Sequence, residues 1–164
     1  MAPRWHEACR VADVEAAAAA SRGLHVNVAG AAITIFASRD GALSAVATPC
    51  PHAGHRLSNG HAADPADVED LATGLGVLVQ CPAHAYVYDT KSGACVAAFG
   101  GGAGAATVHA VKRVGAAVHV DLEPRPPASL PPNLTKDVRD RIGLRCVDLA
   151  LRAKFGDDDD DDGD

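Results

Sequence analysis

Four side chains that can bind a soft metal ion stand in two short motifs of the sequence. The first motif is Cys50-Pro51-His52, and the second is Cys81-Pro82-Ala83-His84. Each motif supplies one thiolate and one imidazole, and two sulfur ligands with two nitrogen ligands suit tetrahedral zinc or iron. The spacing alone leaves open whether the four side chains hold one metal ion or two.

The distribution of the four ligands between the motifs favours a pair of irons. Structural zinc modules usually hold their cysteines as one close pair and their histidines as another, whereas each motif here is mixed. A two-iron cluster is held in this mixed way when each loop gives its cysteine to one iron and its histidine to the other. Each motif also contains a proline, which lacks an N–H and restricts φ, so it stiffens the turn around the ligands.

The two motifs resemble the signature of the Rieske [2Fe–2S] domain, which is C-x-H followed by C-x-x-H. The resemblance covers residues 5–123 and implies one cluster, with Cys50 and Cys81 on one iron and His52 and His84 on the other. Further matches to the family are Pro51, Gly54 and Leu57 in the first loop, and Pro82, Asp89 and Gly93 in the second.

Several residues differ from those of the family's high-potential members, and these differences bear on the expected reduction potential of the cluster. Those members have an extra cysteine in each loop, where this chain has His55 and Ala83, and a serine where it has Tyr86. Both differences imply a ferredoxin-like member in the lower part of the roughly −150 to +300 mV Rieske range. Tyr88 is expected to raise the reduction potential instead, since it stands where high-potential members have a tyrosine bonded to a cysteine sulfur.

The resemblance implies an electron-transfer protein rather than an enzyme. The chain is expected to pass single electrons from a flavin-dependent reductase to an oxygenase or another redox enzyme. A Rieske-like small subunit of an assimilatory nitrite reductase is the closest alternative, and a structural zinc module is a third. A catalytic oxygenase subunit needs a second iron site, for which residues 124–164 leave no room.

Short apolar segments separated by turn residues are expected to position the two motifs. Segments rich in β-branched residues recur about every ten residues, with Gly or Asp-Gly between them, which predicts an antiparallel sandwich or small barrel. The expected fold is all-β, and the resemblance makes it the Rieske fold, with antiparallel sheets and a small cluster-binding subdomain. One early helix is predicted at Val11–Ser21. The expected strands are 24–28, 33–36, 43–46, 76–80, 85–88, 106–111 and 116–120.

The composition changes after the β segments. Residues 5–123 are expected to form the Rieske domain, residues 124–133 a proline-rich linker, and residues 134–155 a C-terminal helix. Residues 156–164 are expected to form an acidic disordered tail, since like charges repel one another. The helix is expected to pack on the β domain, with a partner-binding appendage as the alternative. Its apolar stripe consists of Val138, Ile142, Cys146 and Leu149.

Three further expectations concern residues outside the motifs. Residues 53–80 are expected to form a surface insertion. Trp5 is expected to anchor the first strand in the core. The remaining cysteines, Cys9, Cys95 and Cys146, are expected to behave as small buried apolar side chains.

Composition and charge exclude several classes of protein. The 164 residues carry a net charge of −6, but seven of the 21 acidic residues fall in the last eight positions, so the remainder is nearly neutral. Nothing in that remainder indicates a nucleic-acid surface. The sequence has no apolar stretch of about 18 residues that could span a membrane and no secretory signal. Five cysteines at irregular spacing fit a reducing compartment, and the cytoplasm is therefore expected.

Overall fold

The structure is a computed structural model that describes residues 4–50, 55–68, 74–82, 86–98, 104–126 and 128–156. The candidate ligands Cys50 and Cys81 lie within these ranges, and so does Tyr88. The candidate ligands His52 and His84 lie outside the described residues, as does the aspartate-rich segment of residues 157–164.

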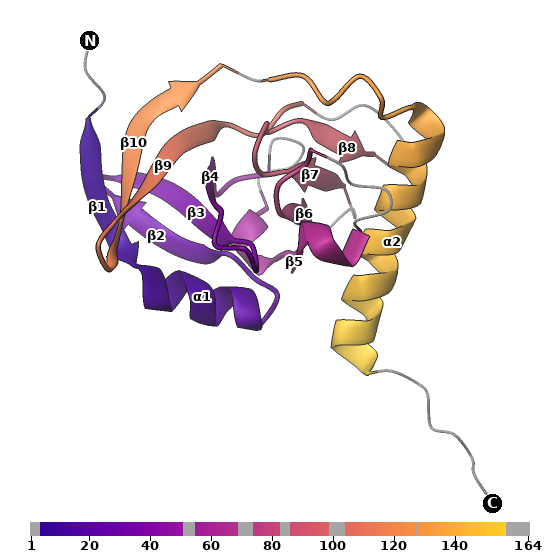
Figure 1. Cartoon of the computed structure of the whole chain (residues 1–164), viewed down its shortest axis with the longest axis horizontal. Helices are drawn as coiled ribbons and strands as arrows, with labels where there is room; N and C mark the ends of the chain where they lie inside the picture. The colour runs from indigo at the N-terminus through magenta and orange to yellow at the C-terminus, as the bar shows by residue number, and fades with distance from the viewer. Residues whose placement is uncertain are drawn as a thin grey trace, which may run out of the picture.

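Two antiparallel sheets make up most of the described part of the chain (Figure 1). The larger sheet has the strand order β1-β10-β9-β4-β3-β2, and the smaller one has the order β5-β6-β7-β8. The strands of the larger sheet are β1 (Trp5–Arg10), β2 (Leu24–Val28), β3 (Ala31–Ala37), β4 (Leu43–Ala47), β9 (Val108–Val114) and β10 (Ala117–Arg125). Those of the smaller sheet are β5 (His61–Ala63), β6 (Leu78–Gln80), β7 (Val87–Asp89) and β8 (Cys95–Ala97).

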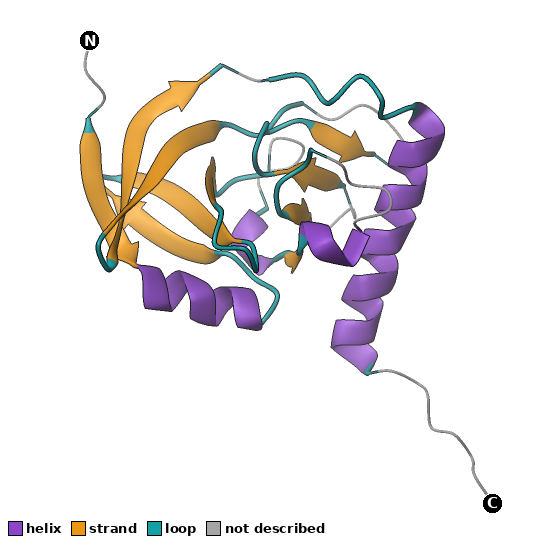
Figure 2. Cartoon of the chain, in the orientation of Figure 1, coloured by secondary structure: helices purple, strands orange, loops and turns teal. Residues whose placement is uncertain are grey.

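Two α-helices lie at the two ends of this arrangement (Figure 2). Helix α1 (Val11–Ala19) follows β1 and packs near the larger sheet, and helix α2 (Lys136–Phe155) packs against the smaller one. A short 3₁₀ turn at Leu57–Asn59 lies between β4 and β5, and a second one at Pro65–Val68 lies between β5 and β6. The structure therefore confirms the predicted antiparallel β fold with an early helix and a C-terminal helix.

Alternating side chains divide the interior into layers, because successive residues of a strand point to opposite faces of its sheet. On β3, Ile35 packs on the face that α1 covers, while Phe36 packs on the face toward the smaller sheet. On β7, Tyr88 packs toward the larger sheet, while Val87 packs toward α2. The layer between the two sheets contains Cys50 and Cys81 together with the apolar residues Phe36, Val46, Leu57, Val79 and Val108.

Helix α2 is fixed to the smaller sheet by one apolar face. The Thr135 side chain caps its N-terminus by accepting a hydrogen bond from the Val138 N–H at 3.3 Å. Ile142 and Cys146 are buried with the residues of the α2-facing layer, which confirms that the helix packs on the β domain. The opposite face exposes large apolar side chains at Leu144 (60 %), Leu151 (51 %) and Phe155 (67 %).

Strand β10 extends further along the chain than the sequence suggests. Pro124 pairs with His109 of β9, and Arg125 pairs with Val108, although residues 124–133 were expected to form a linker. Pro124 follows a shift in the register of the pairing, and proline is tolerated in strands at such irregular positions because it cannot donate a ladder hydrogen bond. The first two residues of the expected linker therefore belong to the sheet.

The interpretation of residues 53–80 as a surface insertion is wrong. The described part of this segment supplies β5, β6 and both 3₁₀ turns. The apolar runs of this segment are short and lie among polar residues, so the sequence pattern does not predict them as strands. The buried side chains of the segment are Leu57, Ala63, Val68, Leu78 and Val79.

Two smaller expectations also fail. Trp5 is partly exposed rather than a core anchor, and the Lys112 ammonium lies 4.2 Å from the centre of its ring. Cys9 and Cys95 are likewise partly exposed, whereas Cys146 is buried as expected.

Among the described residues, no helix combines the length and apolar character needed to cross a lipid bilayer.

Candidate metal centre

The first cysteine stands at the base of a tightly closed loop. Strand β4 ends at Ala47, and the Leu57 N–H then donates to the Thr48 carbonyl at 2.8 Å. One step further in, the Cys50 N–H donates to the His55 carbonyl at 2.6 Å. These bonds bring the two described arms of the loop together, at residues 48–50 and 55–57. The candidate ligand His52 stands between these two arms in the sequence and lies outside the described residues.

The second cysteine stands in a loop that is closed in the same way. The Cys81 N–H donates to the Tyr86 carbonyl at 2.7 Å, and strands β6 and β7 continue the pairing from Gln80 and Val87. In both loops the cysteine N–H thus bonds the carbonyl five residues later. The candidate ligand His84 stands between Cys81 and Tyr86 in the sequence and lies outside the described residues.

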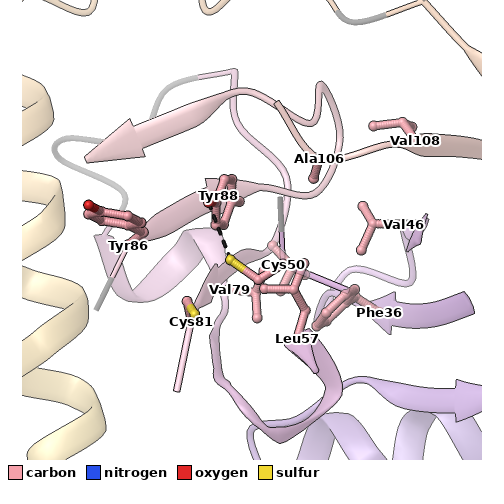
Figure 3. Close-up of a cluster of buried hydrophobic side chains, with 11 residues drawn as sticks. Phe36, Val46, Cys50, Leu57, Val79, Cys81, Tyr86, Tyr88, Ala106 and Val108 are labelled. Atoms are coloured by element: carbon pink, nitrogen blue, oxygen red, sulfur yellow. Dashed lines mark hydrogen bonds between the residues drawn. The ribbon is translucent and has the colours of Figure 1, made fainter. Parts of the chain in front are cut away.

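The two candidate sulfur ligands are buried in the same layer between the sheets (Figure 3). Cys50 is 2 % exposed and Cys81 is 1 % exposed, although strands β5 and β6 and both 3₁₀ turns separate them along the chain. Such a pair can bind a metal ion as thiolates in a setting from which water is excluded. Burial of both sulfurs in one cluster, at the bases of two loops that each carry a histidine, fits a centre with two sulfur and two nitrogen ligands.

Tyr88 lies directly against the first sulfur. Its hydroxyl oxygen is 3.4 Å from Sγ of Cys50, which is the contact that the resemblance implied. Burial raises the pKa of the Tyr88 phenol well above its ordinary value, and the hydrogen bond to Cys50 adds to this effect. The phenol therefore keeps its proton. Because a metal-bound thiolate has no proton, the phenol donates to the sulfur in that state.

Tyr86 is placed differently, although it is also buried next to a candidate ligand. Its backbone carbonyl accepts the hydrogen bond from Cys81, while its hydroxyl points away from the Cys81 sulfur (Figure 3). Tyr86 therefore contributes its backbone carbonyl to the closure of the second loop.

Asp89 organises the turn that follows Tyr88. Its carboxylate is 1 % exposed and accepts hydrogen bonds from the Gly76 N–H at 2.9 Å and from the Ser92 hydroxyl at 2.7 Å. The backbone N–H groups of Lys91 and Ser92 also donate to it, at 3.1 and 3.2 Å. A buried carboxylate with several donors holds a turn firmly, and this explains physically why an aspartate follows the second loop.

Gly93 completes the same turn. It has a φ of +81°, and a Cβ atom built on it would lie 2.3 Å from the Ala106 carbonyl oxygen. Its carbonyl accepts a hydrogen bond from the Ala106 N–H at 2.7 Å, so the turn is tied to the segment that leads into β9. Both the positive φ and the close approach require glycine.

Two residues that sequence reasoning missed link the two sheets beside the site. The Ser44 and Thr90 hydroxyl oxygens are 2.6 Å apart, and the Thr90 hydroxyl donates to the Val77 carbonyl at 2.8 Å. No spacing rule could have identified a pair 46 positions apart, because the contact exists only once the sheets have packed.

Within the described ranges, no three histidine, cysteine or acidic side chains gather closely enough to hold a metal ion. The candidate set has two of its four members, His52 and His84, outside those ranges. The described residues therefore carry the two sulfur positions, the tyrosine beside one of them, and the closures of both loops.

Comparison with known families identifies the sequence pattern. The model of the Rieske [2Fe-2S] domain matches residues 4–100, which is more than half of the chain. Comparison with curated protein sequences gives no match.

Solved structures with a similar fold come from several redox systems. NdmB of Pseudomonas putida CBB5 is 22 % identical with a TM-score of 0.58, and the match covers 73 % of this chain and 34 % of NdmB. The chain thus spans about a third of the length of that protein.

Two shorter relatives match over nearly their whole length. A protein of Mycobacterium tuberculosis assigned as the small subunit of an NADH-dependent nitrite reductase is 20 % identical, with a TM-score of 0.57 and coverage of 78 % of this chain and 100 % of that chain. A chain from the complex of reduced oxygenase and oxidized ferredoxin in carbazole 1,9a-dioxygenase is 20 % identical, with a TM-score of 0.57 and coverage of 74 % and 95 %. At these identities the likeness concerns the fold.

Proposed function

The chain belongs to the Rieske [2Fe–2S] domain family, and from this premise we propose that Cys50, Cys81, His52 and His84 hold one [2Fe–2S] cluster. The observation that carries the proposal is the burial of Cys50 and Cys81 in one layer, at the bases of two loops closed by the same hydrogen bond. The family pattern assigns the two cysteines to one iron and the two histidines to the other.

The residues of the chain have distinct tasks in this proposal. When bound, the cluster takes up and releases one electron at a time. Cys50 and Cys81 supply two negative charges from a buried position, and the imidazoles of His52 and His84 bind as neutral ligands. Tyr88 donates a hydrogen bond to Cys50, which draws electron density from the sulfur and favours the reduced state.

We further propose that the chain acts as a one-electron carrier between a flavin-dependent reductase and an oxygenase or another redox enzyme. The match over 95 % of a chain from an oxygenase–ferredoxin complex supports this role, since that chain is similar in size to the Rieske domain alone. The five cysteines, an odd number for a disulfide framework, favour the reducing cytoplasm as its compartment.

A small subunit of a nitrite reductase is the second candidate function. It is favoured by the match over 100 % of the chain from Mycobacterium tuberculosis. The carrier role is preferred because this chain has all four residues of the ligand signature, which a purely structural subunit does not need.

The cluster is tested by anaerobic reconstitution with iron and sulfide, followed by reduction with dithionite. We expect about two irons and two sulfides per chain, and a rhombic EPR signal with an average g of about 1.9. His84→Cys should change the g-values and lower the midpoint potential, whereas His119→Cys on strand β10 should leave both unchanged. Colourless protein that contains zinc in place of iron would overturn the proposal.

The carrier role is tested with NADH, a flavin-dependent ferredoxin reductase and cytochrome c as the final electron acceptor. The rate of cytochrome c reduction should rise in proportion to the concentration of the reconstituted protein. Cys50→Ser, which removes one proposed ligand, should abolish this dependence. A rate that is the same with and without the reconstituted protein would contradict the carrier role while leaving the cluster assignment intact.

A further inference from the structure

Helix α2 has one charged side chain, that of Arg139, on the part of its surface near the smaller sheet. Arg139 lies between Val138, which packs on the α2-facing layer, and the fully buried Ile142. Its Nε atom is buried and has no hydrogen-bond partner in the described part of the chain. Buried donors are nearly always satisfied, so this nitrogen sets Arg139 apart from the paired arginines of the same helix.

The other charged residues of α2 are arranged differently. The ion pairs of the described helix are Lys136–Asp140, Arg141–Asp137, Arg145–Asp148 and Arg152–Asp148. Arg139 belongs to none of these pairs. Arg141, two residues away, is 58 % exposed and is bound to Asp137 at 3.1 Å. The charge of Arg139 is therefore less compensated and less exposed to solvent than that of its neighbour.

The packing of α2 connects the region of Arg139 with Cys50 through two strands of the smaller sheet. Helix α2 packs on β8, the edge strand of the smaller sheet. Cys95 of β8 pairs in register with Tyr88 of β7, and the Tyr88 hydroxyl lies 3.4 Å from the sulfur of Cys50.

The electrostatics of Cys95 agree with this placement. Burial raises the pKa of the Cys95 thiol to about 11; Cys50 acts in the same direction, and the Arg139 guanidinium acts in the opposite one. The same thiol is thus within electrostatic range of both the cation on α2 and a proposed ligand.

A positive charge near a redox centre raises the reduction potential of that centre. Reduction adds one negative charge to the centre, so a nearby cation stabilises the reduced form. The effect persists at moderate salt when the cation is partly buried, because charges removed from solvent are screened much less than exposed ones.

We propose that Arg139 raises the reduction potential of the centre held by Cys50 and Cys81, acting through space from the C-terminal helix. This inference rests on the proposed function. It makes α2 a part of the redox site in addition to its role in packing on the smaller sheet. Arg139 acts by its charge.

The test measures the midpoint potential of the reconstituted full chain by optical redox titration. Arg139→Gln should lower the midpoint by the equivalent of at least a threefold change in the equilibrium constant, which is about 28 mV at about 59 mV per tenfold for one electron. Arg139→Lys keeps the charge and should retain most of the wild-type midpoint. Arg141→Gln removes an exposed, paired charge from the same helix and should leave the midpoint unchanged.

Iron content and the EPR g-values identify variants in which the centre itself is unaltered. If Arg139→Gln does not assemble the cluster, Arg139→Met provides a neutral side chain of similar length. An unchanged midpoint in an intact Arg139→Gln or Arg139→Met protein would overturn the proposal, as would equal shifts in Arg139→Gln and Arg141→Gln. Wild-type protein that assembles no cluster would overturn the proposed function itself, and so the two failures are distinguishable.

Discussion

Cys50, Cys81 and Tyr88 show how single residues define this site. The two thiol groups are buried, and the phenol beside Cys50 retains its proton because burial raises its pKa. A buried hydrogen bond to a ligand sulfur withdraws electron density from it, and hydrogen bonds to sulfur are one of the factors that set Fe–S potentials. The potential of the proposed cluster should therefore respond to the removal of one hydroxyl group.

Tyr88→Phe removes that hydroxyl while leaving the ring in the core. We expect the midpoint potential to fall by some tens of millivolts, where about 59 mV corresponds to a tenfold change for one electron. The measurement is a redox titration of the reconstituted variant beside the wild type. Tyr86→Phe is the matched control, since the Tyr86 hydroxyl points away from the Cys81 sulfur (Figure 3). Equal midpoints for wild type and Tyr88→Phe would remove Tyr88 from the redox site.

At the scale of elements, the site depends on two loops and on the turn that follows β7. The loops are closed by the same backbone hydrogen bond, from Cys50 to His55 and from Cys81 to Tyr86. The turn after β7 keeps Tyr88 in position through the buried carboxylate of Asp89 and the backbone of Gly93. Substitutions that disturb this turn should therefore destabilise the part of the fold formed by the smaller sheet.

Gly93→Ala tests the turn. The added Cβ would meet the Ala106 carbonyl oxygen at 2.3 Å, in a backbone with a φ of +81°. We expect the free energy of unfolding of the apoprotein to fall by about 2–4 kcal/mol, from the left-handed conformation and the clash together. Urea unfolding followed by circular dichroism measures this change.

Gly115→Ala provides the control for the clash. Gly115 also has a positive φ, of +60°, but a Cβ atom there meets nothing within 4 Å. The loss of stability should be about 1–2 kcal/mol, from backbone strain alone. If both alanine variants lose the same stability, the close approach of Gly93 to Ala106 does not exist in solution.

At the scale of the whole molecule, three buried layers connect the parts of the fold. One lies between α1 and the larger sheet, one between the two sheets, and one between the smaller sheet and α2. The proposed metal centre belongs to the middle layer. Each strand that borders this layer also supplies side chains to an outer layer, so the helices support the site through the outer layers.

Ile142→Ala tests how firmly α2 belongs to this arrangement. Ile142 is fully buried among residues of the smaller sheet and of the segment before α2. Truncating it should lower the free energy of unfolding by about 2–5 kcal/mol. Leu144→Ala, on the exposed face of the same helix, should change stability by no more than about 0.5 kcal/mol. A similar small effect for both variants would mean that α2 does not dock in solution.

The sequence alone was sufficient for the family and for the general form of the fold. The ligand signature is local, with each cysteine and its histidine within four positions, so it can be found without a structure. Strands β2, β3 and β4 could be predicted because their apolar runs are bounded by turn residues, and α2 because its apolar stripe repeats with the helical period.

The tertiary structure decided what depends on contacts between distant residues. The burial of Leu57, Leu78 and Val79, the pairing of Pro124 with β9 and the bond between Ser44 and Thr90 all arise when separate segments pack together. Arg139 is one of several arginines on α2 in the sequence, and only the folded structure, in which α2 packs on β8, distinguishes its buried Nε from the exposed, paired Arg141. Local spacing encodes which atoms can bind a metal, whereas the charges and dipoles that tune such a centre are set by distances that exist only in the folded chain.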